Sequence, residues 1–167
     1  MGKPPFPVRE RGNCPSYKMH SACLSTPLGP LSVTEEAGVI TRLEWVACLQ
    51  APSALTGEAL RQLDAYFARR LTRFDLPLDM GQGFAAQVRR AMVAIPLGET
   101  RSYGDLARQI GAPPQAVGQA CGANPIPILI PCHRILGARS LGGFSAKGGV
   151  ETKVWLLKHE GAASLLI

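Results

Sequence analysis

Residues 102–122 read Ser102-Tyr-Gly-Asp-Leu-Ala-Arg-Gln-Ile-Gly-Ala-Pro-Pro-Gln-Ala-Val-Gly-Gln-Ala-Cys-Gly122 and predict two short helices joined by a tight turn. Ser102 and Asp105 have the spacing of a capping box, with aspartate in the place of the usual glutamate or glutamine, so we expect a helix to begin there. Gly111 and the prolines after it interrupt this helix, and Pro114 suits the first position of a second helix that reaches about Gly122. This is the helix-turn-helix pattern, although many helical hairpins share it.

A cysteine and a histidine follow this region, in the segment Asn124-Pro-Ile-Pro-Ile-Leu-Ile-Pro-Cys-His-Arg-Ile135. The nucleophilic form of cysteine is the thiolate, and a neighbouring imidazole is a common means of producing it. The prolines around the apolar run 128–130 predict a short, stiff and buried extended segment that brings Cys132 to a surface or pocket. Cysteine is also a common small core residue, so the pair alone leaves both interpretations open.

The residues before position 84 predict a small sheet and a helix. Strand-like runs cover 17–26 and 30–47, with a turn at 26–29 and a hairpin turn at 36–38. One face of a helix is indicated by the spacing of Leu60, Leu63, Phe67 and Leu71. A linker containing prolines and glycines follows at 74–83.

The second half is predicted to be mainly helical. An additional helix before the helix-turn-helix is indicated by Phe84, Val88, Met92 and Ile95, and a last helix covers about 150–160 with Gly161 as its C-cap. We therefore expect an α+β protein with a flexible arm at 1–16, an N-terminal α/β domain at 17–79 and a C-terminal helix-turn-helix domain at 80–167.

The composition indicates a globular protein that binds a polyanion. The 167 residues are 46% hydrophobic and 18% charged, and no apolar run approaches the ~20 residues that span a bilayer. The start lacks the apolar core of a signal peptide, so we expect a cytoplasmic protein, or a nuclear one in a eukaryote. Of the net charge of +6, residues 84–160 carry +5, which indicates nucleic acid as a partner. A merely soluble basic surface is the alternative.

Five cysteines, an odd number, suit a reducing compartment. Cys14, His20 and Cys23 cluster near the N-terminus and could hold zinc with Cys48 as a fourth ligand. Their spacing fits no common zinc motif, so we expect ordinary thiols and no metal site.

Several separated segments resemble one family, the O6-alkylguanine-DNA alkyltransferases, or methylated-DNA–protein-cysteine methyltransferases. They occur in the family's order and cover about residues 84–161, with a further likeness in the N-terminal half at Thr26-Pro-Leu-Gly-Pro-Leu31. The matching segments are Gly98-Glu-Thr-Arg-Ser-Tyr-Gly-Asp-Leu-Ala107, Ala116-Val-Gly118, Gly122-Ala-Asn-Pro125, Ile130-Pro-Cys-His-Arg134, Gly142-Gly-Phe-Ser145 and Lys153-Val-Trp-Leu-Leu-Lys-His-Glu-Gly161.

The resemblance implies a ribonuclease-H-like N-terminal domain and a winged-helix-like C-terminal domain that binds duplex DNA in the minor groove. The damaged base, O6-alkylguanine with O4-alkylthymine as a further candidate, would be flipped into a pocket because its alkyl group is otherwise inaccessible. Cys132 would accept the alkyl group irreversibly, so that each molecule reacts once. The resemblance implies no cofactor, and a single flipped base requires no second subunit, so we expect a monomer.

The resemblance also assigns roles to residues around Cys132. His133 would take the thiol proton through a water molecule, and Glu160 would accept the other imidazole N–H. Asn124 would link the recognition helix to the active-site segment. Tyr103 would donate a hydrogen bond or a proton to the guanine N3.

Other residues would bind the base and the DNA. The Ser145 region would donate to the guanine O6, the Cys132 and Ile135 carbonyls would accept from the exocyclic amine of the guanine, and Phe144 would belong to the lid of the pocket. DNA contacts are expected from Gln115, Ala116, Gly118, Gly122 and Arg134, the small residues allowing close approach to the DNA backbone.

The sequence departs from the family at three places. Gln115 stands where many members have an arginine that fills the space left by the flipped base, and Phe144 stands where tyrosine is frequent. The segment 145–149 is about two residues longer than in some members, which predicts a lid of different shape.

Three other functions remain open at this stage. A non-catalytic lesion sensor of the same fold would bind damaged DNA without taking the alkyl group, but such relatives lack the reactive cysteine. A helix-turn-helix regulator could use Cys132 to sense alkylation, although its recognition helix is poor in base-reading side chains. A thiol hydrolase could use Cys132, His133 and Glu160, but would have no use for a basic helix-turn-helix.

Overall fold

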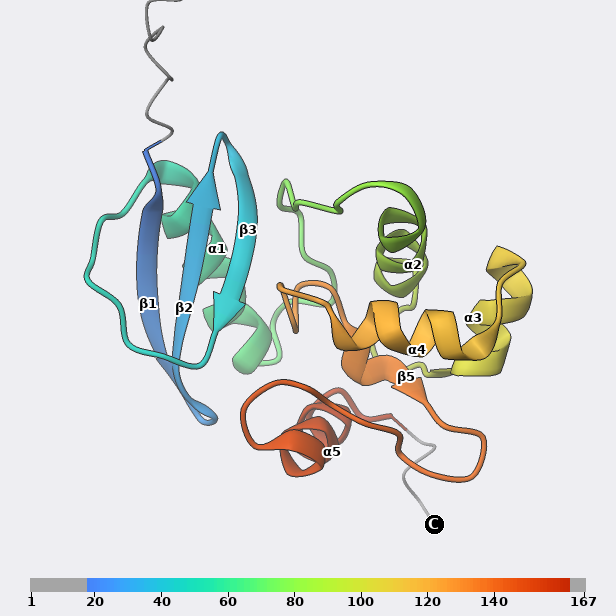
Figure 1. Cartoon of the computed structure of the whole chain (residues 1–167). Helices are drawn as coiled ribbons and strands as arrows, with labels where there is room; N and C mark the ends of the chain where they lie inside the picture. The colour runs from blue at the N-terminus through green and yellow to red at the C-terminus, as the bar shows by residue number, and fades with distance from the viewer. Residues whose placement is uncertain (1–17, 163–167) are drawn as a thin grey trace, which may run out of the picture.

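The computed structural model describes residues 18–162 and shows an α+β protein (Figure 1), as predicted. The N-terminal half contains β1 (His20–Thr26), β2 (Gly29–Glu36), β3 (Val39–Glu44) and α1 (Ala54–Phe67). The C-terminal half contains α2 (Gly83–Val93), β4 (Arg101–Ser102), α3 (Tyr103–Ile110), α4 (Pro114–Gly122), the 3-10 turn η1 (Cys132–Arg134), β5 (Ile135–Leu136) and α5 (Gly149–His159). The predicted arm at 1–16 lies outside the described residues.

The three strands form an antiparallel meander in the order β1-β2-β3, and α1 packs against this sheet (Figure 1). The predicted turn at 26–29 is present, where the Thr26 hydroxyl donates to the Gly29 carbonyl at 2.7 Å. Leu31 and Val33 on β2 and Ile40 on β3 are buried in the core, and Ser32 between the first two is buried as well. The predicted helix is shorter than its pattern, because α1 ends at Phe67 and Leu71 lies beyond it.

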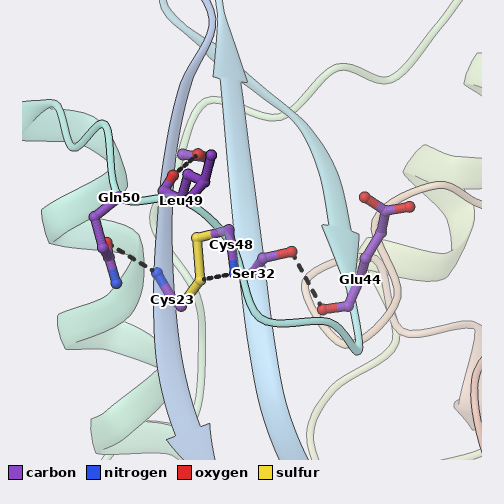
Figure 2. The surroundings of a disulfide bond; sticks show 7 residues. Cys23, Ser32, Glu44, Cys48, Leu49 and Gln50 are labelled. Atoms are coloured by element: carbon purple, nitrogen blue, oxygen red, sulfur yellow. Dashed lines mark hydrogen bonds between the residues drawn. A yellow bond between two sulfur atoms is a disulfide. The ribbon is translucent and has the colours of Figure 1, made fainter.

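A disulfide joins Cys23 on β1 to Cys48 in the segment after β3 (Figure 2), so the expectation of ordinary thiols is wrong for this pair. The segment returns along the free edge of β1, where Ser21 and Ala51 exchange backbone hydrogen bonds of 3.0 and 2.9 Å. This places the two Cα atoms 6.0 Å apart, within the range of disulfides. Among residues 18–162, no group of three or more potential ligands could hold a metal ion, and Cys14 lies outside this range.

The helix-turn-helix forms as predicted from α3 and α4. Ser102 and Asp105 make the reciprocal bonds of a capping box, in which the Ser102 hydroxyl accepts from the Asp105 amide and the Asp105 carboxylate accepts from the Ser102 amide. Gly111 ends α3 with a φ of 74°, a left-handed conformation that favours glycine. Pro114 then occupies the first turn of α4, where its missing N–H costs no hydrogen bond.

The segment 124–131 is a series of turns instead of the predicted extended strand. Three prolines remove backbone donors from it, and the remaining bonds close locally, with the Ile130 amide donating to the Ile126 carbonyl at 2.9 Å. Ile128 has a φ of 72°, which a strand would not contain. The apolar side chains of this segment are nevertheless buried in the core, at 2% exposure or less for residues 126 and 128–130.

The two halves meet along α1 and α5, where aromatic rings pack together. Tyr66 on α1 lies with its ring centroid 5.2 Å from that of His159 on α5, and the His159 ring stacks on Trp155 at 4.8 Å. Within residues 18–162, the structure contains no helix that is long and apolar enough to cross a membrane.

Candidate active site

Cys132 begins the 3-10 turn η1 and is 8% exposed. Burial raises the pKa of its thiol, opposed by a hydrogen bond from the Asn124 side chain and by the charge of Lys153. A thiol with a raised pKa is protonated at neutral pH. Cys132 therefore requires a base to become nucleophilic.

His133 provides such a base next to Cys132 in the chain. Its ring is completely buried, and Nε2 lies 2.7 Å from the Glu160 carboxylate, which can only accept a hydrogen bond when ionised. Nε2 therefore carries the proton, and Nδ1 keeps a lone pair that no residue of the described range occupies. Burial lowers the pKa of His133 despite the raising effect of Glu160, so the ring is neutral at rest and able to accept a proton.

Glu160 is the C-cap residue of α5, where a carboxylate is disfavoured by the helix dipole. It is compensated by donors from three residues, which are Tyr66 Oη at 2.8 Å, His133 Nε2 at 2.7 Å, and Arg134 Nε and Nη2 at 2.8 and 3.0 Å. Burial alone would raise the pKa of Glu160, but the hydrogen bonds from His133 and Arg134 lower it to about 2. The predicted pairing of Glu160 with the imidazole is thus present, within a larger network.

Arg134 does not face solvent, which corrects the expectation that it contacts DNA. Only 7% of the residue is exposed. Its guanidinium donates to both Glu160 oxygens and, through Nη1, to the Ile95 carbonyl at 2.6 Å. A buried guanidinium needs such partners, so Arg134 supports the Glu160 carboxylate from inside the fold.

Asn124 follows α4, and its side chain bonds within the segment that leads to Cys132, so its predicted link to the recognition helix stays a prediction. Its Nδ2 donates to the Ile130 carbonyl at 2.8 Å, and its Oδ1 accepts from the Ile126 amide at 3.1 Å. The side chain therefore replaces the strand pairing that the prolines prevent. It fixes the turns that lead into Cys132.

A cavity of about 490 Å³ opens at Cys132, a volume within the ~300–1,000 Å³ that small-molecule sites occupy. It lies between α3, α4 and the loop before α5, and is lined by Tyr103, Gly118, Cys121, Gly122, Cys132, Gly143, Phe144 and Ser145. A second hollow of similar size shares Cys132 and Ser145 and extends to the end of β3 and to Trp45, which follows it. The sequence therefore placed Tyr103, Phe144 and Ser145 correctly beside Cys132.

Tyr103 forms one wall of the cavity, and glycines allow other segments to approach its ring. A Cβ on Gly142 would meet the ring at 2.9 Å, and one on Gly118 would touch it at 4.0 Å. Gly142 also has a φ of 70°, so a larger residue would be strained there for two reasons. Gly118 therefore lines the cavity. The sequence predicted only that this glycine lets the helix approach DNA.

The remaining predicted residues lie around this cavity. Gln115 is exposed at the start of α4, and Ala116 beside it is half-buried. Gly122 lines the cavity, where its carbonyl accepts from the Ser145 hydroxyl at 2.9 Å. The Ile135 side chain is buried, and its carbonyl accepts from Lys153 at 2.5 Å.

Three residues of the site were missed by sequence reasoning. Tyr66 reaches Glu160 from the N-terminal half, and Lys153 is buried beneath the cavity. Cys121 is a second free thiol on the cavity wall. The sequence around each of these residues gives no indication that it belongs to the site. Tyr66 and Lys153 occur within helical patterns, and Cys121 occurs among small residues.

Both halves of the chain match described families. Residues 83–162 match the family described as 6-O-methylguanine DNA methyltransferase, DNA binding domain, and residues 19–80 match 6-O-methylguanine DNA methyltransferase, ribonuclease-like domain. A methylated-DNA–protein-cysteine methyltransferase from Mycobacterium leprae is 42% identical over 164 residues, covering 89% of this chain and 98% of the relative. The chain belongs to the 6-O-methylguanine DNA methyltransferase family.

Other family members agree in sequence and structure. The constitutive methylated-DNA–protein-cysteine methyltransferase of Bacillus subtilis is 39% identical over 150 residues, which is 81% of this chain and 91% of that relative. The crystal structure of Mycobacterium tuberculosis O6-methylguanine methyltransferase aligns with a TM-score of 0.76 at 39% identity, covering 87% of this chain and 94% of that one. A structure of Mycobacterium tuberculosis OGT in complex with DNA also aligns at 0.76, with 41% identity and coverage of 86% and 93%.

Proposed function

We propose that this protein repairs DNA by transferring the alkyl group of O6-alkylguanine to Cys132, once per molecule. The observation that carries this proposal is a buried thiol on the wall of a base-sized cavity, followed in the chain by a histidine that Glu160 holds in one tautomer. The cavity adjoins a helix-turn-helix, the element that places a protein on duplex DNA. The names of the relatives, and the family itself, agree with this activity.

The chemistry begins with proton transfer within a neutral pair. Cys132 gives its proton to Nδ1 of His133, directly or through one water molecule, and the imidazolium is stabilised by Glu160. The thiolate then attacks the alkyl carbon, forming the C–S bond as the bond from that carbon to O6 breaks. The electron pair of the broken bond passes to the guanine.

Tyr103 completes the reaction at the other side of the base. Its hydroxyl transfers its proton to the guanine N3, so that the guanine leaves as a neutral molecule. The tyrosinate that remains regains a proton as the His133 imidazolium gives up the one it took from Cys132. Phe144 and Ser145 also line the cavity, and the Ser145 hydroxyl, which donates to the Gly122 carbonyl in the structure, would turn to donate to O6. The product thioether has no good leaving group, so Cys132 remains alkylated.

The DNA contacts are assigned to α3 and α4, which enter the minor groove while the target base occupies the cavity. Gln115 at the exposed start of α4 would fill the space that the base leaves, without the charge of an arginine. Ala116 and the glycines of α4 let the helix approach the duplex. In this proposal residues 80–167 perform the reaction as a monomer, and residues 17–79 support Glu160 through Tyr66.

The test is to incubate the protein with a duplex that carries one O6-methylguanine and to measure intact and peptide mass. One methyl group should appear on the peptide containing Cys132, in a 1:1 ratio with protein. Cys132→Ala should abolish the transfer, whereas Cys121→Ala, which removes the other free thiol of the cavity, should retain it. Tight binding without a mass gain would overturn the proposal and identify a lesion sensor.

A further inference from the structure

Trp45, which directly follows β3, reaches the Cys132 site from the N-terminal half of the chain. The Leu43 amide near the end of β3 donates to the Pro125 carbonyl at 3.0 Å, which fixes this end of the sheet to the segment that leads to Cys132. The rings of Trp45 and Phe144 meet edge to face, with their centroids 6.4 Å apart. Only 7% of Trp45 is exposed, so the sheet contributes a buried aromatic ring to the site.

Trp45 lines the hollow of about 490 Å³ that adjoins the base cavity. Cys132 and Ser145 line both spaces, so the thiol lies at the boundary between them. The buried part of the lining of this hollow is apolar and includes Leu43 and Pro127. The charged residues of the lining are exposed to solvent, and these are Arg42, Glu44 and Lys147.

The position of this hollow suits an alkyl group larger than methyl. In an in-line displacement the reacting carbon lies between O6 and the attacking sulfur, so the other groups on that carbon point sideways from this line. The base occupies the cavity at Tyr103, and a larger alkyl group therefore needs a second space that opens at the same sulfur. The hollow beside Trp45 opens there, and its volume falls within the ~300–1,000 Å³ of small-molecule sites, far more than a methyl group requires.

We propose that Trp45 is a specificity-determining residue that binds the alkyl group of the lesion when this group is larger than methyl. The substrate class is O6-alkylguanine with an arylmethyl group, such as benzyl, because its ring can pair with the indole ring. The C–S bond forms as the bond from the benzyl carbon to O6 breaks, and the electron pair passes to the guanine, as in methyl transfer. This inference rests on the proposed alkyl transfer to Cys132.

The surroundings of Trp45 allow substitutions that remove one property at a time. Its Nε1 is buried and has no hydrogen-bond partner among residues 18–162, so Trp45→Phe breaks no hydrogen bond and keeps an aromatic ring. Trp45→Leu keeps an apolar side chain without a ring. Trp155 stacks on His159 and lines neither space, so the same substitutions there are the matched controls.

The first measurement compares two duplexes, one with a single O6-benzylguanine and one with a single O6-methylguanine. The rate of transfer to Cys132 is followed by peptide mass, with Cys121→Ala in every protein, and the benzyl-to-methyl ratio cancels a general loss of folded protein. Trp45→Leu should lower this ratio by roughly two- to tenfold, the effect of losing one aromatic pair, and Trp45→Phe should restore most of it. Trp155→Leu should keep the wild-type ratio. An unchanged or raised ratio in Trp45→Leu would overturn the proposal.

The second measurement needs neither DNA nor a substitution at Trp45. In Trp155→Phe, Trp45 is the remaining tryptophan of the chain, so tryptophan emission reports on this residue alone. Benzyl bromide places a benzyl group on the Cys132 sulfur as bromide leaves, and iodomethane places a methyl group there as iodide leaves. The benzyl adduct should change the emission of Trp45 much more than the methyl adduct, with Cys132→Ala treated in the same way as the blank. Equal emission from the two adducts would contradict contact between Trp45 and the alkyl group.

Together the two measurements separate this proposal from the alkyl transfer on which it rests. If neither duplex alkylates Cys132 but benzyl bromide changes the Trp45 emission, alkyl transfer is rejected and the contact between Trp45 and a benzyl group on Cys132 is supported. If both duplexes alkylate Cys132 and the ratio is the same in wild type and Trp45→Leu, alkyl transfer is supported and the role of Trp45 is rejected.

Discussion

Replacing Glu160 with glutamine tests the buried network at the site directly. The wild-type carboxylate accepts from Tyr66, His133 and Arg134, and only 6% of the residue is exposed. The glutamine amide has almost the same shape as the carboxylate but no charge. Its NH2 group takes the place of one carboxylate oxygen and cannot accept the hydrogen bonds that this oxygen accepts. The variant therefore leaves the Arg134 guanidinium buried without its counter-ion, a change that costs about 3–5 kcal/mol in buried pairs.

The pKa of Glu160 gives an independent measure of this effect and its sign. The network lowers the pKa from 4.5 to about 2, and each pKa unit corresponds to about 1.4 kcal/mol, so the carboxylate stabilises the fold by roughly 3 kcal/mol. Because the pKa is lowered in the folded state, this stabilisation is fully present above pH 4.5 and is lost as the pH falls through 2. At pH 3 roughly 1.5 kcal/mol remains by the same relation.

Urea unfolding of wild type and Glu160→Gln at pH 7 and pH 3 measures this dependence. The difference between the two proteins should fall by about 2 kcal/mol between these pH values, since the wild type becomes progressively protonated. Glu151→Gln, an exposed position on the same helix, should show no such change. An equal difference at both pH values would refute the network as the source of the lowered pKa, and alkyl transfer by Glu160→Gln should be slower at pH 7.

Two further predictions concern regions away from this network. Loss of the Cys23–Cys48 disulfide, by reduction or by Cys23→Ser, should lower the free energy of unfolding by up to about 3.5 kcal/mol, the loop-entropy value for a separation of 25 residues, with alkyl transfer retained. Equal urea midpoints for oxidised and reduced protein would contradict this. Gln115→Arg should tighten binding to the O6-methylguanine duplex at low salt and steepen its dependence on log salt by about 0.9. Gln119→Arg, one turn further along α4, adds the same charge, and an equal gain there would show that position 115 has no special role.

Local chemistry explains why the helix-turn-helix could be predicted from the sequence. The capping box at Ser102, the left-handed Gly111 and the first-turn Pro114 each act within a few residues, so their effect on the backbone can be read without the rest of the fold. The pairing of Cys132 with His133 is equally local, because the two residues are neighbours in the chain. Glu160 required the family resemblance, because nothing in the sequence between them brings α5 to η1.

The features that escaped prediction depend on tertiary contacts or on competition between local effects. Arg134 was expected at the DNA from the family resemblance, but Glu160 and the Ile95 carbonyl act as its acceptors inside the fold. The segment 124–131 has the apolar run of a strand, yet its prolines remove the donors a strand needs and the Asn124 side chain supplies turns instead. The disulfide depended on a loop returning along the edge of β1, which cysteine spacing does not reveal.

The proposed reaction creates two opposite charges inside the protein, and a group of the opposite charge lies near each of them. Transfer of a proton from Cys132 to His133 gives a thiolate and an imidazolium where two neutral groups stood. The cation that favours the thiolate is Lys153, and the anion that holds the imidazolium is Glu160, itself held by Arg134. Lys153 and Glu160 are seven residues apart on α5 and its cap, which places them two turns apart on one face. A single helix, fastened to the N-terminal half through Tyr66, therefore stabilises both products of the proton transfer and lowers the cost of making a nucleophile in a buried site.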